Sequence, residues 1–195
     1  MFYRVTAGAG LVCAGLLVFN ALRRAGVVPE NAVTHAVAPF AALTGLLMVT
    51  GLYLLARHTA GGLGVVGYVL NAAGLAGAFA VEYVLHFVFP LLAGGTVRGL
   101  LDGATGRAFL VTSVILMVGV LTFGAAALRS GVFPVPAVLL YMAGMVPGSL
   151  RNAVPEPVYL GGLVVAAAGV AWLAARLWGA EEDRTAPVVT STARA

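Results

Sequence analysis

The sequence contains no lysine and only one cysteine, and each scarcity excludes a type of chemistry. All eleven basic residues among the 195 are arginines. Without lysine the chain can form neither a Walker A phosphate loop nor a Schiff base, which also excludes retinal attachment. Cys13 alone can form no internal disulfide and no cysteine-based zinc or iron–sulfur site.

Charged residues of either sign are also scarce. They make up 9% of the chain, against 61% hydrophobic residues, whereas a soluble domain has about 25% charged residues. The charges fall between long apolar runs, which predicts an all-α, polytopic integral membrane bundle embedded in a lipid bilayer. The arginines lie at the ends of these runs, where they meet lipid head groups. We therefore expect no nucleic-acid binding, despite a net charge of +4.

Six apolar segments are about as long as the roughly 20 residues that a spanning helix needs. These are Val5–Leu22, Val33–Ala56, Gly62–Phe89, Phe109–Leu128, Val132–Leu150 and Val158–Trp178. They define one six-helix transmembrane domain over residues 1–178. Leu91–Arg107 is expected to be the longest internal loop, and residues 179–195 form a polar tail that we expect to be disordered.

The first apolar segment is predicted to remain as a helix and not to be a cleaved signal peptide, because it ends in Arg23-Arg24, a stop-transfer pattern. An even number of helices places both termini on one side of the membrane. The arginines divide five against six between the two sides, so the positive-inside rule gives no orientation. We expect a bacterial-type cell membrane with both termini in the cytoplasm.

The third apolar segment carries most of the polar side chains that could perform chemistry. At about 100° per residue, Asn71 and Glu82 fall on nearly the same face, Tyr68 is close to it, and His86 follows Glu82 by one turn. Glu82 lies roughly 12 Å inside the helix end that Pro90 sets, which is hydrocarbon depth. An ionisable group there costs about 2.5–3.5 kcal/mol on insertion scales and needs a partner, for which His86 is nearest.

Glu82 and His86 are therefore the candidate catalytic pair, since a carboxyl and an imidazole in contact can hold or release a proton near neutral pH. The candidate ligand-binding residues are His35, Tyr68, Asn71, Tyr83 and Arg151. An antiparallel hairpin brings His35 to the depth of His86. Arg151 lies on the same membrane face, where it can pair with Glu82 or clamp an anionic head group.

Each of these residues also has a purely structural interpretation. Glu82 and His86 can form a hydrogen-bonded pair that fixes helix packing, and Asn71 can do the same between helices. His35 can be an interfacial residue behind a Thr34 N-cap, which is the interpretation we favour for it. Arg151 can simply mark the membrane interface.

Three classes of function remain open on the sequence alone. The leading hypothesis is a pocket around Glu82, His86 and His35 that binds a lipophilic or small ligand, with proton transfer; the sequence does not decide whether the chain is an enzyme. The alternative is a transport or accessory subunit of a larger membrane complex, as a homo- or hetero-oligomer, with Glu82 structural or part of a proton relay. The third is a haem or metal protein through His35 and His86.

Overall fold

The computed structural model describes residues 1–151 and 153–185, and all of its regular elements over these ranges are helical. The long helices are α1 (Phe2–Arg24), α3 (Phe40–Ala56), α4 (Gly61–Tyr83), α6 (Ala104–Ser130), α7 (Val135–Ser149) and α8 (Glu156–Thr185). The shorter ones are α2 (Ala32–Val37) and α5 (Gly94–Asp102). A π turn (Val84–Val88) and a 3₁₀ turn (Phe89–Leu91) continue α4. The predicted all-α membrane bundle is confirmed.

Within the described ranges, five helical stretches are long and apolar enough to cross a membrane. They are Phe2–Arg24, Ala32–Ala56, Gly61–Leu91, Ala104–Ser130 and Glu156–Glu182. The remaining predicted span corresponds to α7, which has 15 residues with Pro147 inside it. It is therefore shorter than the roughly 20 residues of a regular spanning helix.

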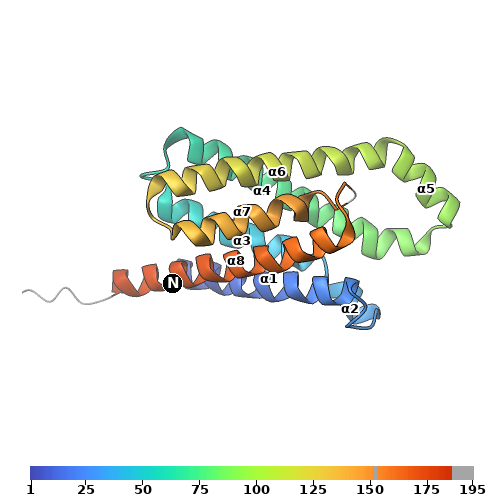
Figure 1. Cartoon of the computed structure of the whole chain (residues 1–195), viewed down its shortest axis with the longest axis horizontal. Coiled ribbons are helices and arrows are strands. Elements are labelled where there is room, and N and C mark those ends of the chain that lie inside the picture. The colour runs from blue at the N-terminus through green and yellow to red at the C-terminus, as the bar shows by residue number, and fades with distance from the viewer. Residues whose placement is uncertain (152, 186–195) are drawn as a thin grey trace, which may run out of the picture.

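The helices run side by side, and the connections close the two ends of the bundle (Figure 1). Helix α4 packs along α6, α1 and α7 both pack along α8, and α3 lies between α1 and α4. The short helices α2 and α5 lie at the end of the bundle away from the N-terminus. The connections 25–31 and 89–103 and the described residues 150, 151 and 153–155 are therefore gathered at this end, while the N-terminus lies at the opposite end.

Glycines allow the paired helices to approach closely. A Cβ atom at Gly74 of α4 would overlap the backbone of Leu116 in α6. A Cβ atom at Gly119 of α6 would overlap the backbone of Asn71. Without side chains at these positions the two backbones come into direct contact, as small residues permit in membrane bundles.

The segment Leu91–Arg107, expected to be a loop, contains the helix α5. Its apolar residues Val97, Leu100 and Leu101 recur at helical spacing. This spacing is typical of a short amphipathic helix lying in a membrane interface. The expectation of a loop was wrong because it weighed the glycines of this segment above the spacing of its leucines.

Helix α8 continues beyond Trp178, so the boundary predicted for the polar tail was too early. Glu181 is buried against the start of α1, where its carboxylate accepts a hydrogen bond from the backbone N–H of Tyr3 at 3.1 Å and pairs with the Met1 amine. This contact extends the packing of α8 on α1 by one further turn. Residues 186–195, the remainder of the predicted disordered tail, lie outside the described residues.

Candidate functional site

Four polar side chains form one connected group at the end of the bundle that holds α2 and α5. The Nδ1 atoms of His35 and His86 are 2.8 Å apart, and His86 Nε2 lies 3.1 Å from Glu82 Oε2. The other carboxylate oxygen, Glu82 Oε1, lies 3.6 Å from Arg151 Nη1. The structure thus connects α2, α4 with its π turn, and the α7–α8 connection through Glu82, His86, His35 and Arg151.

His86 lies in the π turn that follows α4. Pro90 comes four residues later. In a regular α-helix a proline ring clashes with the carbonyl group of the residue four positions before it, which here is His86. The helix widens into a π turn ahead of this proline. Such turns occur frequently at functional sites, because they alter the direction in which side chains leave the helix.

His35 is held by the capped first turn of α2. The side-chain oxygen of Asn31 accepts hydrogen bonds from the backbone N–H groups of Val33 and Thr34, both at 3.0 Å. In return, Thr34 Oγ1 accepts from the Asn31 N–H at 2.9 Å. The N-cap is therefore Asn31, and the expectation that Thr34 caps this helix was wrong, because Thr34 serves as the third residue of a capping box.

Arg23 belongs to the same group, although it was interpreted from the sequence as a stop-transfer charge. Its side chain is only 2% exposed. Its Nη1 lies 3.4 Å from Glu30 Oε1, and its Nη2 lies 3.3 Å from His86 Nε2. The chain after α1 turns back so that Glu30 covers the guanidinium. No pattern in the sequence indicates this, because the loop conformation is what buries Arg23.

Arg24 reaches the site from the neighbouring face of α1. Its guanidinium lies 5.2 Å from the ring centroid of Tyr159 on α8, in a cation–π geometry. The sequence did contain a signal for this residue. Arg24 continues the series Ala14, Leu17 and Ala21, which recurs every three to four residues and marks the buried face of α1.

His86 can hold its proton in two ways, because its Nε2 atom faces both an acceptor and a donor. An ionised carboxylate only accepts hydrogen bonds, and a guanidinium only donates them. With a proton on Nε2, His86 donates to Glu82 and its Nδ1 accepts from His35. With a proton on Nδ1, His86 donates to His35 and its Nε2 accepts from Arg23. The two tautomers place the proton on opposite sides of the ring.

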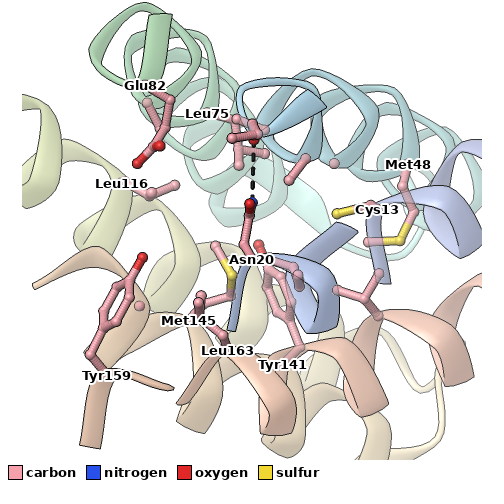
Figure 2. Close-up of a pocket in the computed structure, with 18 of the residues that line it drawn as sticks. Cys13, Asn20, Met48, Leu75, Glu82, Leu116, Tyr141, Met145, Tyr159 and Leu163 are labelled. Atoms are coloured by element: carbon pink, nitrogen blue, oxygen red, sulfur yellow. Dashed lines mark hydrogen bonds between the residues drawn. The ribbon is translucent and has the colours of Figure 1, made fainter. Parts of the chain in front are cut away.

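Two cavities meet at Glu82. The first, of about 110 Å³, lies among α1, α3, α4, α7 and α8. The second, of about 550 Å³, lies between α4 and α6 and extends to α5 and the α7–α8 connection. Glu82 and Tyr159 line both. Figure 2 shows the Glu82 carboxylate and the Tyr159 hydroxyl pointing toward one another at one edge of the first cavity.

Buried polar atoms without hydrogen-bond partners gather at these cavities. Within the described residues such atoms include Asn20 Oδ1, Arg23 Nε and Arg151 Nη1, and each of these residues lines one of the two cavities. The Asn20 amide nitrogen is satisfied, since it donates to the Ala38 carbonyl at 3.3 Å (Figure 2). Buried polar groups are nearly always hydrogen-bonded in proteins, so these atoms have unused capacity for a ligand or for water.

Asn71 and Tyr68, which were predicted to share the site, lie elsewhere on α4. Asn71 is fully buried and donates to the Tyr141 hydroxyl on α7 at 2.7 Å. It reaches the smaller cavity only through Tyr141, which lines it. Tyr68 stacks on Tyr53 of α3 with ring centroids 4.5 Å apart. The shared stripe on α4 is therefore divided between different neighbouring helices.

Tyr83 also points away from the polar group. It is 49% exposed, and its ring packs beside Phe79 and Phe87. This aromatic row faces outward from α4 and the π turn. Adjacent positions on a helix differ by about 100°, which is why Tyr83 and Glu82 face different surroundings.

The two histidines are arranged for hydrogen bonding to each other. Nitrogen ligands lie about 2.0–2.1 Å from a zinc ion, so a metal between the two Nδ1 atoms would need them much farther apart than 2.8 Å. The Nε2 of His86 is occupied by contacts with Glu82 and Arg23. Over residues 1–151 and 153–185, no group of three or more His, Cys, Asp or Glu side chains is arranged to hold a metal ion.

Comparisons with known protein families, with curated proteins and with solved structures found no match to this chain. The chemistry of the site is therefore inferred from the contacts of its own residues.

Proposed function

We propose that this membrane protein binds a lipophilic small molecule beside Glu82 and exchanges a proton with it through Glu82, His86 and His35. One observation carries the proposal. The hydrogen-bonded chain from His35 through His86 ends at a carboxylate that lines both cavities. Glu82 acts as the acid or base, and His86 is the partner that supplies or removes its proton.

The larger cavity has the size and lining that such a ligand needs. Its volume of about 550 Å³ falls within the roughly 300–1,000 Å³ of small-molecule sites. Leucine is the most frequent residue in its wall, and Glu82, Ser113 and Arg151 are among its polar groups. An apolar wall with a few converging polar groups supports binding of a lipophilic molecule in a defined orientation.

The depth of Glu82 supports a functional role. It lies inside the span Gly61–Leu91 and about 12 Å before Pro90, so we place its carboxylate in the hydrocarbon region. A charge at this depth costs about 2.5–3.5 kcal/mol on insertion scales, and such residues generally line ligand or proton pathways.

Proton delivery follows from the two tautomers of His86. A proton taken up at His35 Nε2 allows His35 to pass its Nδ1 proton to His86 Nδ1. His86 in turn passes its Nε2 proton to Glu82 Oε2. One proton enters, one carboxyl becomes protonated, and the bare Nε2 of His86 then accepts from Arg23. Since α2 begins with exposed residues, the chain starts at the aqueous edge.

The same proton chain supports a second candidate, a proton-relay or transport subunit of a larger membrane complex. In that case Glu82 passes its proton to a partner protein and not to a small ligand. Isolation of the chain with a stoichiometric partner from native membranes, together with failure to bind a lipophilic probe, would favour this candidate.

We further propose that the protein resides in a bacterial-type cell membrane with both termini in the cytoplasm. The site then opens toward the outer face, because the connections beside α2 and α5 lie at the end of the bundle opposite to the N-terminus.

The binding experiment uses 11-(dansylamino)undecanol, a neutral fluorescent amphiphile, with the protein in phosphatidylcholine nanodiscs. We expect saturable binding of one probe per chain. Ser113→Phe should weaken binding at least about tenfold because it removes space from the larger cavity, and Glu82→Gln should do so because it replaces the charged carboxylate by a neutral amide with only one acceptor oxygen. Glu156→Gln is the matched control, since Glu156 is an exposed carboxylate at the same end of the bundle.

Equal probe binding by wild type and Ser113→Phe would contradict the proposal. If Glu82→Gln fails to accumulate in the membrane while Glu156→Gln accumulates normally, Glu82 is instead a packing residue. Expression levels and the circular dichroism of each variant make this distinction.

A further inference from the structure

We infer that the ligand beside Glu82 is an amphiphile whose alkyl chain fills the larger cavity and whose anionic oxygen head group is bound by Arg24 and Arg151. The head group is a carboxylate or a phosphate. The inference rests on the proposed function and names the class of ligand.

Positive charge exceeds negative charge at the polar end of the cavities. The guanidinium groups of Arg23, Arg24 and Arg151 gather around one carboxylate, Glu82. Of these three arginines, only Arg23 forms an ion pair with an acidic residue other than Glu82: its Nη1 lies 3.4 Å from Glu30 Oε1. Arg24 forms no ion pair within the part of the chain that the structure describes; its guanidinium lies over the ring of Tyr159. A bound anion would balance this excess.

Arg151 shows the need for an anion most directly. Its Nη1 is buried without a hydrogen bond, since Glu82 Oε1 is 3.6 Å away. Burial lowers the pKa of Arg151, and the like charge of Arg24 lowers it further, although Glu82 acts in the opposite direction. The Tyr159 ring that lies beside the Arg24 guanidinium lines the larger cavity together with Arg151, and among the described residues that line the two cavities Glu82 is the only acidic one. A carboxylate or phosphate supplies paired acceptor oxygens that match the guanidinium fork.

The arginines are placed at the polar boundary of an apolar space. Arg151 and Glu82 line the larger cavity together with Leu85, Phe109 and Leu110. Arg24 lines the smaller cavity, which shares the lining residues Glu82 and Tyr159 with the larger one. A head group held by the two arginines would therefore leave its chain to run along the apolar wall.

Other ligand classes fit this boundary less well. A cationic ligand would meet guanidinium groups of its own sign. A neutral ligand without acceptor oxygens would leave the buried Arg23 Nε and Arg151 Nη1 unsatisfied, because a guanidinium carries only donors. An anionic head group supplies acceptor oxygens to the Arg151 donor and lowers the net charge of the site.

Three probes that share one dansyl-undecyl chain test the inference: the alcohol, the carboxylic acid and the phosphate monoester. Binding is titrated in phosphatidylcholine nanodiscs, which contain no anionic lipid. We expect both anionic probes to bind at least about tenfold more tightly than the alcohol. In Arg24→Gln and in Arg151→Gln, the ratio of the affinity for each anionic probe to the affinity for the alcohol should fall about tenfold. Arg98→Gln, an exposed arginine on α5, should retain the full preference.

The alcohol probe distinguishes failure of the proposed lipophilic site from failure of the inferred anionic ligand class. If the alcohol binds and the anionic probes bind no more tightly, the ligand class is wrong and the lipophilic site stands. If none of the three probes binds to the wild type, the proposed function fails. The circular dichroism of each arginine variant, measured in the same nanodiscs, shows whether the variant is folded.

Inorganic phosphate and acetate distinguish the source of the anion. Because the chain contributes to binding, we expect neither ion at millimolar concentration to displace the phosphate probe. If inorganic phosphate displaces the phosphate probe at a concentration similar to that of the probe itself, the site binds a soluble anion. This result would overturn the assignment to an amphiphile.

Discussion

At the scale of single residues, the behaviour of the site depends on His86, because each of its ring nitrogens has a different polar neighbour. Its Nδ1 contacts His35, and its Nε2 lies between Glu82 and Arg23. A change of tautomer at this one residue therefore changes which neighbour receives a hydrogen bond from His86. This coupling needs no movement of a helix, and it is built from contacts of 2.8–3.3 Å.

Tyr141 tests whether the other buried polar pair is structural. Tyr141→Phe removes the oxygen that accepts from Asn71 and leaves a buried amide with an unpaired donor. We expect the free energy of unfolding to fall by about 1 kcal/mol, measured by unfolding in mixed detergent micelles. Tyr83→Phe, at an exposed tyrosine, should leave it unchanged. An equal loss in both variants would contradict this role for Asn71.

Part of the site was predictable from single residues and part was not. The one-turn spacing of Glu82 from His86 and the hairpin that brings His35 to His86 are both properties of the linear sequence. Arg23 was not predictable, because its burial depends on how the loop after α1 folds back. Arg24 could have been found, since it continues the buried face of α1. The adjacent arginines Arg23 and Arg24 instead suggested two charges among the lipid head groups at the end of the span.

At the scale of elements, the capping box of α2 holds one end of the proton chain. Asn31→Ala removes the side chain that accepts from two backbone N–H groups. We expect the cap to lose about 1 kcal/mol, which should raise amide hydrogen exchange across Ala32–Val37 about fivefold. Asn31→Asp keeps the acceptor and should exchange like the wild type. Unchanged exchange in Asn31→Ala would show that tertiary contacts alone hold α2.

The pairing of α4 with α6 depends on glycine contacts. Gly119→Ala places a methyl group against the backbone of Asn71. We expect a loss of about 1–3 kcal/mol in unfolding free energy, as for other overpacked interfaces. Gly15→Ala, at a position with no atom within 4 Å of the added carbon, is the control and should not destabilise the protein. A similar effect of both substitutions would contradict close packing at this interface.

The elements themselves were largely predictable, since the length of each apolar run predicts a helix. The errors concern one short helix and one helix end. Helix α5 was missed because its glycines suggested a loop, and α8 was ended too early because its last turns carry acidic residues. The sequence could not show that Glu181 is buried against α1, since this depends on the pairing of the first helix with the last.

At the scale of the whole molecule, the bundle has two distinct ends. One end holds α2, α5 and the polar group, and the other holds the N-terminus and the connections 57–60 and 131–134. This division makes the proposed orientation testable. If the termini are cytoplasmic, the polar group lies near the outer face of the membrane.

Single cysteines on a Cys13→Ala background test this orientation in intact cells. We expect a membrane-impermeant maleimide to label Val27→Cys and Ala153→Cys, which are exposed positions in connections at the site end. His58→Cys and Gly131→Cys, in connections at the opposite end, should react only after the cells are opened. The reverse pattern would place the site at the cytoplasmic face.

The most direct measurement of the central claim is an infrared difference spectrum of the protein in nanodiscs, recorded when the neutral dansyl-undecanol probe is added. An alkyl chain that displaces water from the cavity favours the uncharged form of a neighbouring carboxyl. We therefore predict a new carbonyl stretch of a protonated carboxylic acid, shifted in heavy water, present in Glu156→Gln and absent in Glu82→Gln. A spectrum without this band, or with the same band in Glu82→Gln, would contradict proton exchange at Glu82.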